Sequence, residues 1–191
     1  MKAAFIDFLR NLQPKVGIWR SAHRSVLLRL LGLNLGSACV ICRGIRWPLF
    51  SLSQITIGSG VQIGEYSHLF VPVSNKSAKI TVGARTSLGE RNTICALGEF
   101  SIGTDCLFSH DVFMADSEHI IGRNIKPRES GLQFRGNISI GDRCFIGRNV
   151  TILPGVTLGH NCVVGAGAVV TKSFPDNSII GGIPAKLIKT L

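Results

Sequence analysis

Long apolar runs are missing from this chain of 191 residues. Its stretch LLRLL is interrupted by Arg29, whereas a membrane-spanning helix needs about 20 consecutive apolar residues. Asp7 and Arg10 break the short apolar stretch near the start, and no small-residue cleavage site follows them. We therefore expect neither a transmembrane helix nor a signal peptide.

Aromatic residues and acidic residues are also scarce. Aromatics make up only 7% of the chain. There are 11 acidic residues against 21 basic ones, so the formal net charge is +10. Nucleic-acid binding is the first explanation to test for such a charge. The basic residues are spread along the chain, however, and no stacking motif or recognition helix is present. We expect no nucleic-acid partner; a phosphorylated cofactor or an anionic polysaccharide accounts for the charge.

A zinc-site pattern is absent as well. Cys39 and Cys42 form a CxxC, but no second pair follows at the spacing of a zinc site, and no strand–helix redox context surrounds the motif. The sequence therefore predicts no metal site.

The dominant positive feature is a beat of six residues, in which an aliphatic residue is followed by a small one. From residue 140 onward the heads of these hexads are Ile140, Ile146, Ile152, Leu158, Val164 and Val170. A period of six fits neither an α-helix nor simple strand alternation, and it is the signature of a hexapeptide β-helix. The head points into the coil, and the following Gly allows a tight corner. The beat predicts a mainly β solenoid.

The beat continues upstream in blocks of about three hexads, each block corresponding to one triangular coil. The upstream heads are Ile57, Ile63, Leu69, Val82, Leu88, Ile94, Ile102, Phe108 and Met114, with weaker hexads at Leu35 and Ile41. The beat is lost between about residues 120 and 137, where we expect a loop extruded from one corner. This pattern predicts a β-helix domain over residues 35–181 and a tail over residues 182–191.

All six cysteines occupy small-residue slots of the hexads. Cys39, Cys106, Cys144 and Cys162 take the fifth position, and Cys42 and Cys95 take the second. Free buried thiols behave as small hydrophobic residues and persist in a reducing compartment. We therefore expect a packing role for the cysteines and a cytoplasmic protein.

The first 34 residues lack the beat and are expected to form a basic helical cap, with two helices separated around Pro14. In the second helix one face is apolar and the other is mostly basic: the apolar residues are Trp19, Ala22, Val26, Leu30 and Leu31, and the basic residues are Arg20, Arg24 and Arg29. One interpretation is a cap on the first coil with solvated arginines. The other is an interfacial helix that contacts anionic lipid at the inner membrane. The two are compatible, and both stay open.

Residues 138–191 contain a full run of hexads, then GAGAVVTK, then GGIPAKLI. This stretch resembles the C-terminal half of hexapeptide acyltransferases, in particular the branch of maltose, galactoside and surface-polysaccharide O-acetyltransferases. The upstream hexads extend the resemblance to about residue 35. The resemblance implies a left-handed parallel β-helix, a homotrimer, and direct transfer of an acetyl group from acetyl-CoA to an acceptor hydroxyl.

The resemblance also implies a general-base histidine where the beat stops and the loop leaves. His119 holds that place in the string DSEH, which is one residue longer than the DSH-type motif of the family, and His110 is the reserve. A carboxylate that orients the imidazole improves such a base. Asp116 is the favoured candidate, and Glu118 and Glu129 are the alternatives.

The family pattern places the pantetheine arm of acetyl-CoA in a groove between two subunits, beside the GAGAVVTK hexads. The resemblance then implies a backbone contact at Ala166 and phosphate or pantetheine contacts at Thr171 and Lys172. Lys186 and Lys189 are further candidates near the C-terminus.

The acceptor is not determined by the motifs. A basic helical segment replaces the acceptor module of the maltose enzymes, which favours a surface-polysaccharide or lipid-linked saccharide. An antibiotic or serine is the alternative acceptor. Two hypotheses from other classes are a non-catalytic β-helix scaffold and a γ-type carbonic anhydrase; the latter needs three converging histidines, usually with an H-x4-H pair that the sequence lacks.

Overall fold

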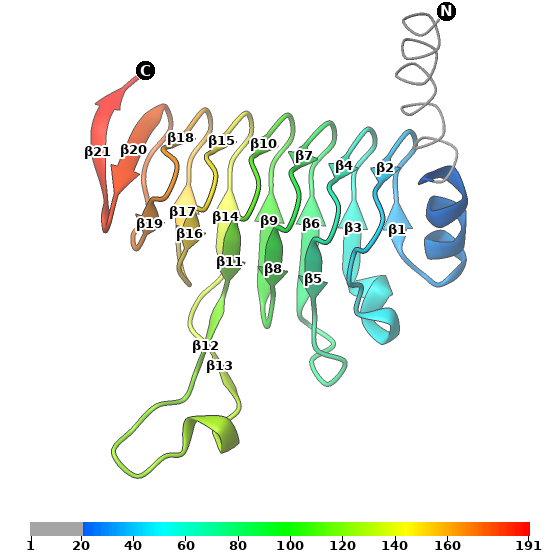
Figure 1. Ribbon diagram of the computed structural model, residues 1–191, viewed down its shortest axis with the longest axis horizontal. Coiled ribbons are helices and arrows are strands. Elements are labelled where there is room, and N and C mark those ends of the chain that lie inside the picture. Colours follow the sequence, from blue (N-terminus) through cyan, green and yellow to red (C-terminus); the bar gives the residue numbers. More distant parts are fainter. Residues whose placement is uncertain (1–20) are drawn as a thin grey trace, which may run out of the picture.

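Each hexad forms one short strand and the corner that follows it, and the coils stack into a triangular solenoid. The computed structural model describes residues 21–191 (Figure 1). Wall 1 contains β1 (Asn34–Leu35), β3 (Ile55–Ile57), β6 (Lys79–Val82), β9 (Glu99–Ile102), β14 (Ile138–Ile140) and β17 (Thr157–Leu158). Wall 2 contains β2 (Val40–Ile41), β4 (Gln62–Ile63), β7 (Ser87–Leu88), β10 (Leu107–Phe108), β15 (Phe145–Ile146), β18 (Val163–Val164), β20 (Ser178–Gly182) and β21 (Ala185–Thr190). Wall 3 contains β5 (His68–Phe70), β8 (Thr93–Cys95), β11 (Phe113–Ala115), β16 (Thr151–Ile152) and β19 (Val169–Val170).

The predicted heads form the core. Along wall 1, parallel pairing places five heads in one column: Ile57, Val82, Ile102, Ile140 and Leu158. All five are buried, as are the heads of the other two walls. Burying one such aliphatic side chain contributes about 1.5–3 kcal/mol relative to leaving it exposed, so the stacked columns are the main stabilising element of the solenoid.

The corners explain the small residues of the beat. A Cβ added at Gly141 would lie 2.7 Å from the carbonyl carbon of Gly159 in the next coil, so the second hexad position has no room for a side chain. Two residues later the chain turns with positive φ, which is +71° at Gly167 and +56° at Asn149 and Asn161. Gly and Asn are the residues that adopt this conformation most readily.

The N-terminal helix, described over residues 21–30, lies against the first coil at the end of the solenoid (Figure 1). Two of its arginines reach the backbone of that coil. Arg24 Nε donates to the Ile41 carbonyl at 2.8 Å, and Arg29 Nε donates to the Leu35 carbonyl at 3.0 Å. Ser21 Oγ accepts a hydrogen bond from the Ile41 amide at 2.6 Å. The first coil has no preceding coil to pair with, and these polar side chains satisfy some of its backbone groups.

The interpretation of a cap with solvated arginines was therefore wrong about Arg24 and Arg29, which bind the backbone of the first coil. Leu28 packs against the coil, whereas Val26, Leu30 and Leu31 are exposed. The reason is that the open end of a solenoid presents unpaired peptide groups, which attract hydrogen-bonding side chains. The predicted first helix, Pro14, Trp19 and Arg20 lie outside the described residues.

The extruded segment and the tail both contain strands that the beat did not predict. β12 (Ser117–His119) pairs antiparallel with β13 (Leu132–Phe134), and η2 (Pro127–Glu129) lies in the connection between them. This hairpin projects from the solenoid below β11 (Figure 1). At the C-terminal end, β21 folds back antiparallel on β20 and covers the last coil. A 3-10 segment, η1 (Leu49–Gln54), lies at the corner before β3.

The cysteines occupy the small-residue slots that the beat assigned to them. Cys106, Cys144 and Cys162 are buried, and Cys39, Cys42 and Cys95 are half-buried; all six are free thiols. Burial raises the pKa of the Cys95 and Cys162 thiols, which keeps them protonated and weakly nucleophilic at neutral pH. No helix within residues 21–191 is long and apolar enough to cross a membrane.

Two substitutions at one corner test this packing. Gly141→Ala should lower the free energy of unfolding by about 1–3 kcal/mol, because its methyl group meets backbone that cannot move aside. Cys144→Ala in the same coil should cost about 1 kcal/mol, because it removes only one buried sulfur. Urea denaturation followed by circular dichroism measures both. Equal stability of Gly141→Ala and the wild type would contradict the stacking argument.

Candidate active site

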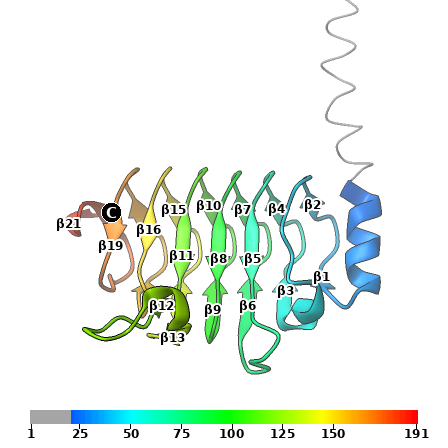
Figure 2. The ribbon, with the colours of Figure 1, turned by 60° about the horizontal axis from the view of Figure 1, so that its bottom comes forward.

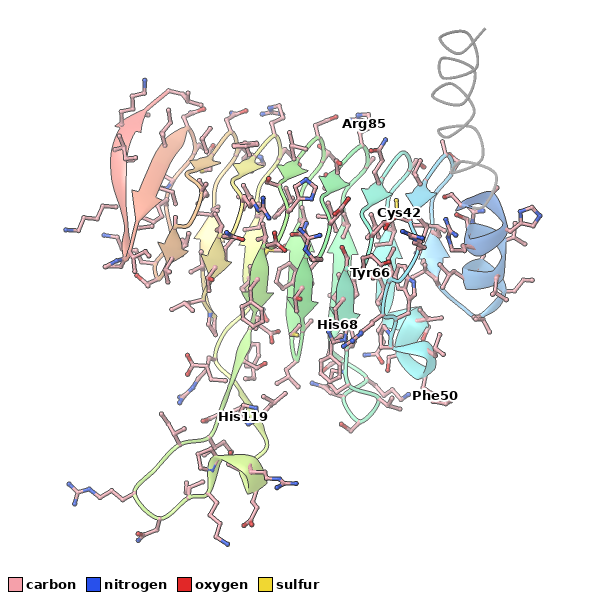
Figure 3. The ribbon with its side chains drawn as sticks, viewed as in Figure 1. Cys42, Phe50, Tyr66, His68, Arg85 and His119 are labelled. Carbon is pink, nitrogen blue, oxygen red and sulfur yellow. The ribbon has the colours of Figure 1, made fainter. Side chains whose placement is uncertain are left out.

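His119 lies at the end of β12, on the projecting hairpin, where it is exposed (Figure 3). It pairs with Leu132 of β13 in an antiparallel register. The hairpin begins directly after β11 of wall 3, so the base predicted from the sequence does lie where a coil gives way to the extruded segment. Within one chain, the hairpin carries this imidazole away from the solenoid surface (Figure 3).

The root of the hairpin is held by several contacts with the preceding coil. The side chain of Phe134 packs over Gly98, where an added Cβ would lie 2.4 Å from the Phe134 ring. Asn137 Oδ1 accepts a hydrogen bond from the Glu99 amide at 2.9 Å. The Arg135 amide donates to the Asp116 carbonyl at 2.9 Å. The root is therefore a fixed platform for the strand that carries His119.

Asp116 belongs to this platform and does not contact the imidazole. Its side chain is fully buried, and its carboxylate accepts hydrogen bonds from the Leu97 amide at 2.8 and 2.9 Å and from the Gly98 amide at 2.7 Å. The expected hydrogen bond from the His119 imidazole to the Asp116 carboxylate is thus not formed in this structure. The physical reason is that two backbone amides at the corner have no other acceptor and capture both carboxylate oxygens.

The alternative carboxylates have other partners as well. Glu118 pairs with Arg135 across the hairpin at 3.4 Å, and it precedes His119 in a strand, so the two side chains point to opposite faces. Glu129 lies in η2 and pairs with Lys126 at 3.4 Å. Neither carboxylate orients His119 within the chain.

Two other histidines have structural partners at the corners. The Glu90 amide donates to His110 Nδ1 at 3.1 Å, and the Asp142 amide donates to His160 Nδ1 at 2.9 Å. An Nδ1 that accepts from an amide is unprotonated, which leaves the proton of a neutral ring on Nε2. His110 and His160 thus continue a series of corner side chains that cap amides of the preceding coil, as Asp142 does for the Thr104 amide at 2.7 Å.

The predicted coenzyme residues gather at the C-terminal end of the solenoid. Ala166 is exposed at the corner after β18, stacked over Gly147 of the preceding coil. Thr171 and Lys172 follow β19 and are exposed, and Lys172 Nζ lies 5.6 Å from the centre of the Phe174 ring. Lys186 and Lys189 are exposed on β21, opposite Gly181 and Ile179 of β20. Lys172, Lys186 and Lys189 make this end cationic. Parallel pairing of β11, β16 and β19 places Thr171 and Lys172 at the same corner as the hairpin root, two coils further along.

Sequence reasoning missed a line of ionic contacts on the corner that also holds Ala166. Arg91 Nε binds Asp111 at 2.6 Å, and Arg148 Nη2 binds the same carboxylate at 3.0 Å. The hydrogen bonds from Arg91 hold the pKa of the Asp111 carboxyl below its usual range. Parallel pairing of β10, β15 and β18 places His110, Arg148 and Ala166 at equivalent positions of successive coils. The sequence does contain a signal for these contacts. Arg91 and Asp111 both take the fourth position of their hexads, and Arg148 takes the third position of a later one.

The sequence also provided no indication of a shallow apolar groove near the N-terminal end of the solenoid. Trp47, Phe50, His68 and Phe70 are among its lining residues. Burial and the nearby Arg46 cation lower the pKa of His68, so its imidazole is neutral at pH 7. Among residues 21–191, no group of three or more His, Cys, Asp and Glu side chains is arranged to hold a metal ion.

Comparison with known proteins links this geometry to an enzyme family. Residues 137–172 match the model described as the hexapeptide repeat of succinyl-transferase. The chain is 30% identical over 165 residues to the putative lipopolysaccharide biosynthesis O-acetyl transferase WbbJ of Escherichia coli K12, which covers 82% of this chain and 71% of that protein. It is 35% identical over 91 residues to the galactoside O-acetyltransferase of the same organism, covering 48% and 44% of the two chains.

Comparison of structures leads to the same enzyme family as comparison of sequences. A galactoside acetyltransferase in complex with coenzyme A superimposes with a TM-score of 0.63 and 29% identity, covering 74% of this chain and 68% of that one. The expected left-handed parallel β-helix is thereby confirmed, and acetyl-CoA is the co-substrate that the relationship supports. The chain belongs to the hexapeptide-repeat acyltransferase family and is an acetyl-CoA-dependent acetyltransferase related to the O-acetyltransferases of that family.

Proposed function

We propose that this protein transfers the acetyl group of acetyl-CoA to a hydroxyl of a saccharide, either a surface-polysaccharide unit or a lipid-linked sugar. The observation that carries the proposal is the exposed His119 at the junction of coil and hairpin, in a chain related over most of its length to an O-acetyltransferase. The printed names of two relatives refer to lipopolysaccharide biosynthesis and to galactosides, which supports a sugar acceptor over an antibiotic or serine.

In the proposed reaction, His119 removes the proton of the acceptor hydroxyl, and the oxygen attacks the thioester carbonyl. The carbon–sulfur bond breaks as the tetrahedral intermediate collapses, and the imidazolium returns its proton to the departing thiolate. An imidazole suits this task because its ordinary pKa lies near neutrality. Cysteine takes no part in this route.

The proposed enzyme is a homotrimer whose active site is shared between neighbouring chains. Two facts support this arrangement. His119 is exposed on a hairpin that projects from the solenoid, and the predicted coenzyme residues lie further along the same chain, at Ala166, Thr171, Lys172, Lys186 and Lys189. Leu107 and Phe145 on wall 2 and Phe113 on wall 3 are 50%, 41% and 45% exposed, which leaves apolar surface on both walls for contact between chains.

Asp116 is proposed to act as a positioning residue rather than as a partner of the imidazole. It fixes the amides of Leu97 and Gly98 at the hairpin root, three residues before His119. The six free thiols support the proposal that the enzyme works in a reducing compartment such as the cytoplasm.

Replacing the proposed base gives the most direct test. His119→Ala should lower kcat by about 10²–10⁴-fold, because one general base is lost, while acetyl-CoA binding stays largely intact. Release of free thiol with a panel of galactosides and polysaccharide repeat units measures the rate, and calorimetry measures binding. The matched control His110→Asn, whose amide oxygen can still accept from the Glu90 amide, should keep the wild-type rate. If His119→Ala retains that rate and His110→Asn loses it, His110 is the base.

The role of Asp116 is tested by Asp116→Asn. The NH2 group of the new asparagine side chain would point at a backbone N–H that now donates to the carboxylate. Two donors would then face each other, so we expect the free energy of unfolding to fall by about 1–3 kcal/mol. In protein that remains folded, kcat should fall modestly and the pH profile of kcat should keep its midpoint. A shifted midpoint with unchanged stability would instead assign Asp116 a direct contact with His119 in the assembled enzyme.

Mixed assembly tests the shared site. Lys172→Glu should raise the KM for acetyl-CoA by placing a negative charge beside a phosphate, and His119→Ala should abolish turnover. At an acetyl-CoA concentration well below the KM of Lys172→Glu, co-refolding the two variants should give more activity than either alone, because some interfaces in a mixed trimer combine an intact His119 with an intact Lys172. Sedimentation verifies that mixed trimers formed. No recovery in verified mixed trimers, or a fully active monomer, would refute the shared site.

A further inference from the structure

The N-terminal helix presents an apolar face to solvent. Val26 and Leu27 are 55% and 56% exposed, and Leu30 and Leu31 are 80% and 51% exposed. Buried Ser21, Ser25 and Leu28, with the two clamping arginines, occupy the opposite side of this helix. An apolar stripe that faces away from the core is unusual in a globular protein and marks an interaction surface.

A second apolar feature lies at the same end of the solenoid. Leu49 and Phe50 of η1 are 59% and 86% exposed. Figures 1 and 2 both place η1 and the N-terminal helix at the N-terminal end, and Figure 3 shows Phe50 pointing away from the solenoid. We call Val26, Leu27, Leu30 and Leu31, with Leu49 and Phe50, the end face.

The charged residues around the end face are mainly basic. Residues 21–64 contain no Asp or Glu and four arginines, of which Arg43 pairs with Glu65 of the next coil at 3.0 Å. Arg24 and Arg29 bind backbone carbonyls of the first two strands, which fixes both guanidinium groups at this end. Arg46, between β2 and η1, is also exposed. Exposed apolar side chains at an end of the solenoid whose charged residues are mainly basic are the features of a surface that binds anionic lipid.

A second copy of this chain fits the end face less well. An end-to-end contact between two copies would bring two sets of arginines together, and like charges oppose association. An anionic bilayer is complementary to the arginines and receives the aliphatic side chains. A helix of this length lies in the plane of the bilayer interface rather than across it.

We propose that the end face docks on the surface of an anionic lipid bilayer, with the N-terminal helix parallel to the membrane plane and the solenoid standing on its N-terminal end. The inference goes beyond the acetyl transfer proposed above and does not depend on which acceptor is used. It would bring the enzyme to the surface where a lipid-linked saccharide resides.

The experiment uses the full chain and vesicles of phosphatidylcholine with or without phosphatidylglycerol. The wild type should sediment with the phosphatidylglycerol vesicles, less so at high salt, and remain in the supernatant with phosphatidylcholine alone. Leu27→Gln combined with Leu30→Gln should weaken binding roughly tenfold or more, because two aliphatic side chains no longer leave water. The control Ile183→Gln changes a residue that is 76% exposed at the opposite end, and it should bind as the wild type does.

Calorimetry of acetyl-CoA binding shows whether a variant that no longer binds vesicles is still folded. Vesicle binding requires neither acceptor nor turnover, so its outcome is independent of the proposed reaction. If the double variant fails to bind acetyl-CoA, Phe50→Ser, which alters a different element, should still weaken vesicle binding. Unchanged vesicle binding in Phe50→Ser and in the folded double variant would overturn the proposal. It would also be overturned if the double variant changed the sedimentation coefficient of lipid-free protein, because the end face would then be a protein contact.

Discussion

The close stacking of one coil on the next is the constraint on which the whole molecule depends. Neighbouring strands lie at the hydrogen-bonding distance of a parallel sheet, about 4.8 Å, along all three walls. That spacing removes the room for a Cβ at Gly141 and equivalent corners, and it aligns the aliphatic heads in continuous columns. It also places each corner amide beside the side chain of the next coil, which is why Asp142 and His160 cap backbone rather than remain free.

Stacking has a cost at the two ends, where peptide groups lose their partner coil. The C-terminal end solves this with backbone, because β21 folds back antiparallel on β20. The N-terminal end solves it with side chains, since Ser21, Arg24 and Arg29 bind the backbone of the first strands. The second solution has a consequence that the first lacks. A helix that turns its polar residues inward must turn its aliphatic residues outward.

The six-residue beat predicted the repetitive part of the fold well because each position has one environment in every coil. Ile140 and Cys144 are buried for reasons that their hexad positions already contain. The same reasoning failed where environments occur only once. The helical pattern around Leu30 identified two faces but could not say which one meets the coil, since the choice depends on unpaired backbone groups in residues 35–41. Asp116 was likewise taken for a partner of His119 because the amides of Leu97 and Gly98 are distant in sequence.

The separation of the candidate residues follows from the same regularity. Side chains inside the triangle are fully packed, so chemistry must occur on a convex outer surface that cannot enclose a substrate. The hairpin that carries His119 departs from the beat for this reason: it projects the imidazole beyond its own coil, on a root fixed by Phe134, Asn137 and Asp116. If His119 is the base, as proposed, it lies beyond its own solenoid and needs another surface that faces it. In the proposed trimer, a neighbouring copy would face the hairpin with the coenzyme residues of its later coils and β21, which would bring the two halves of the proposed site together.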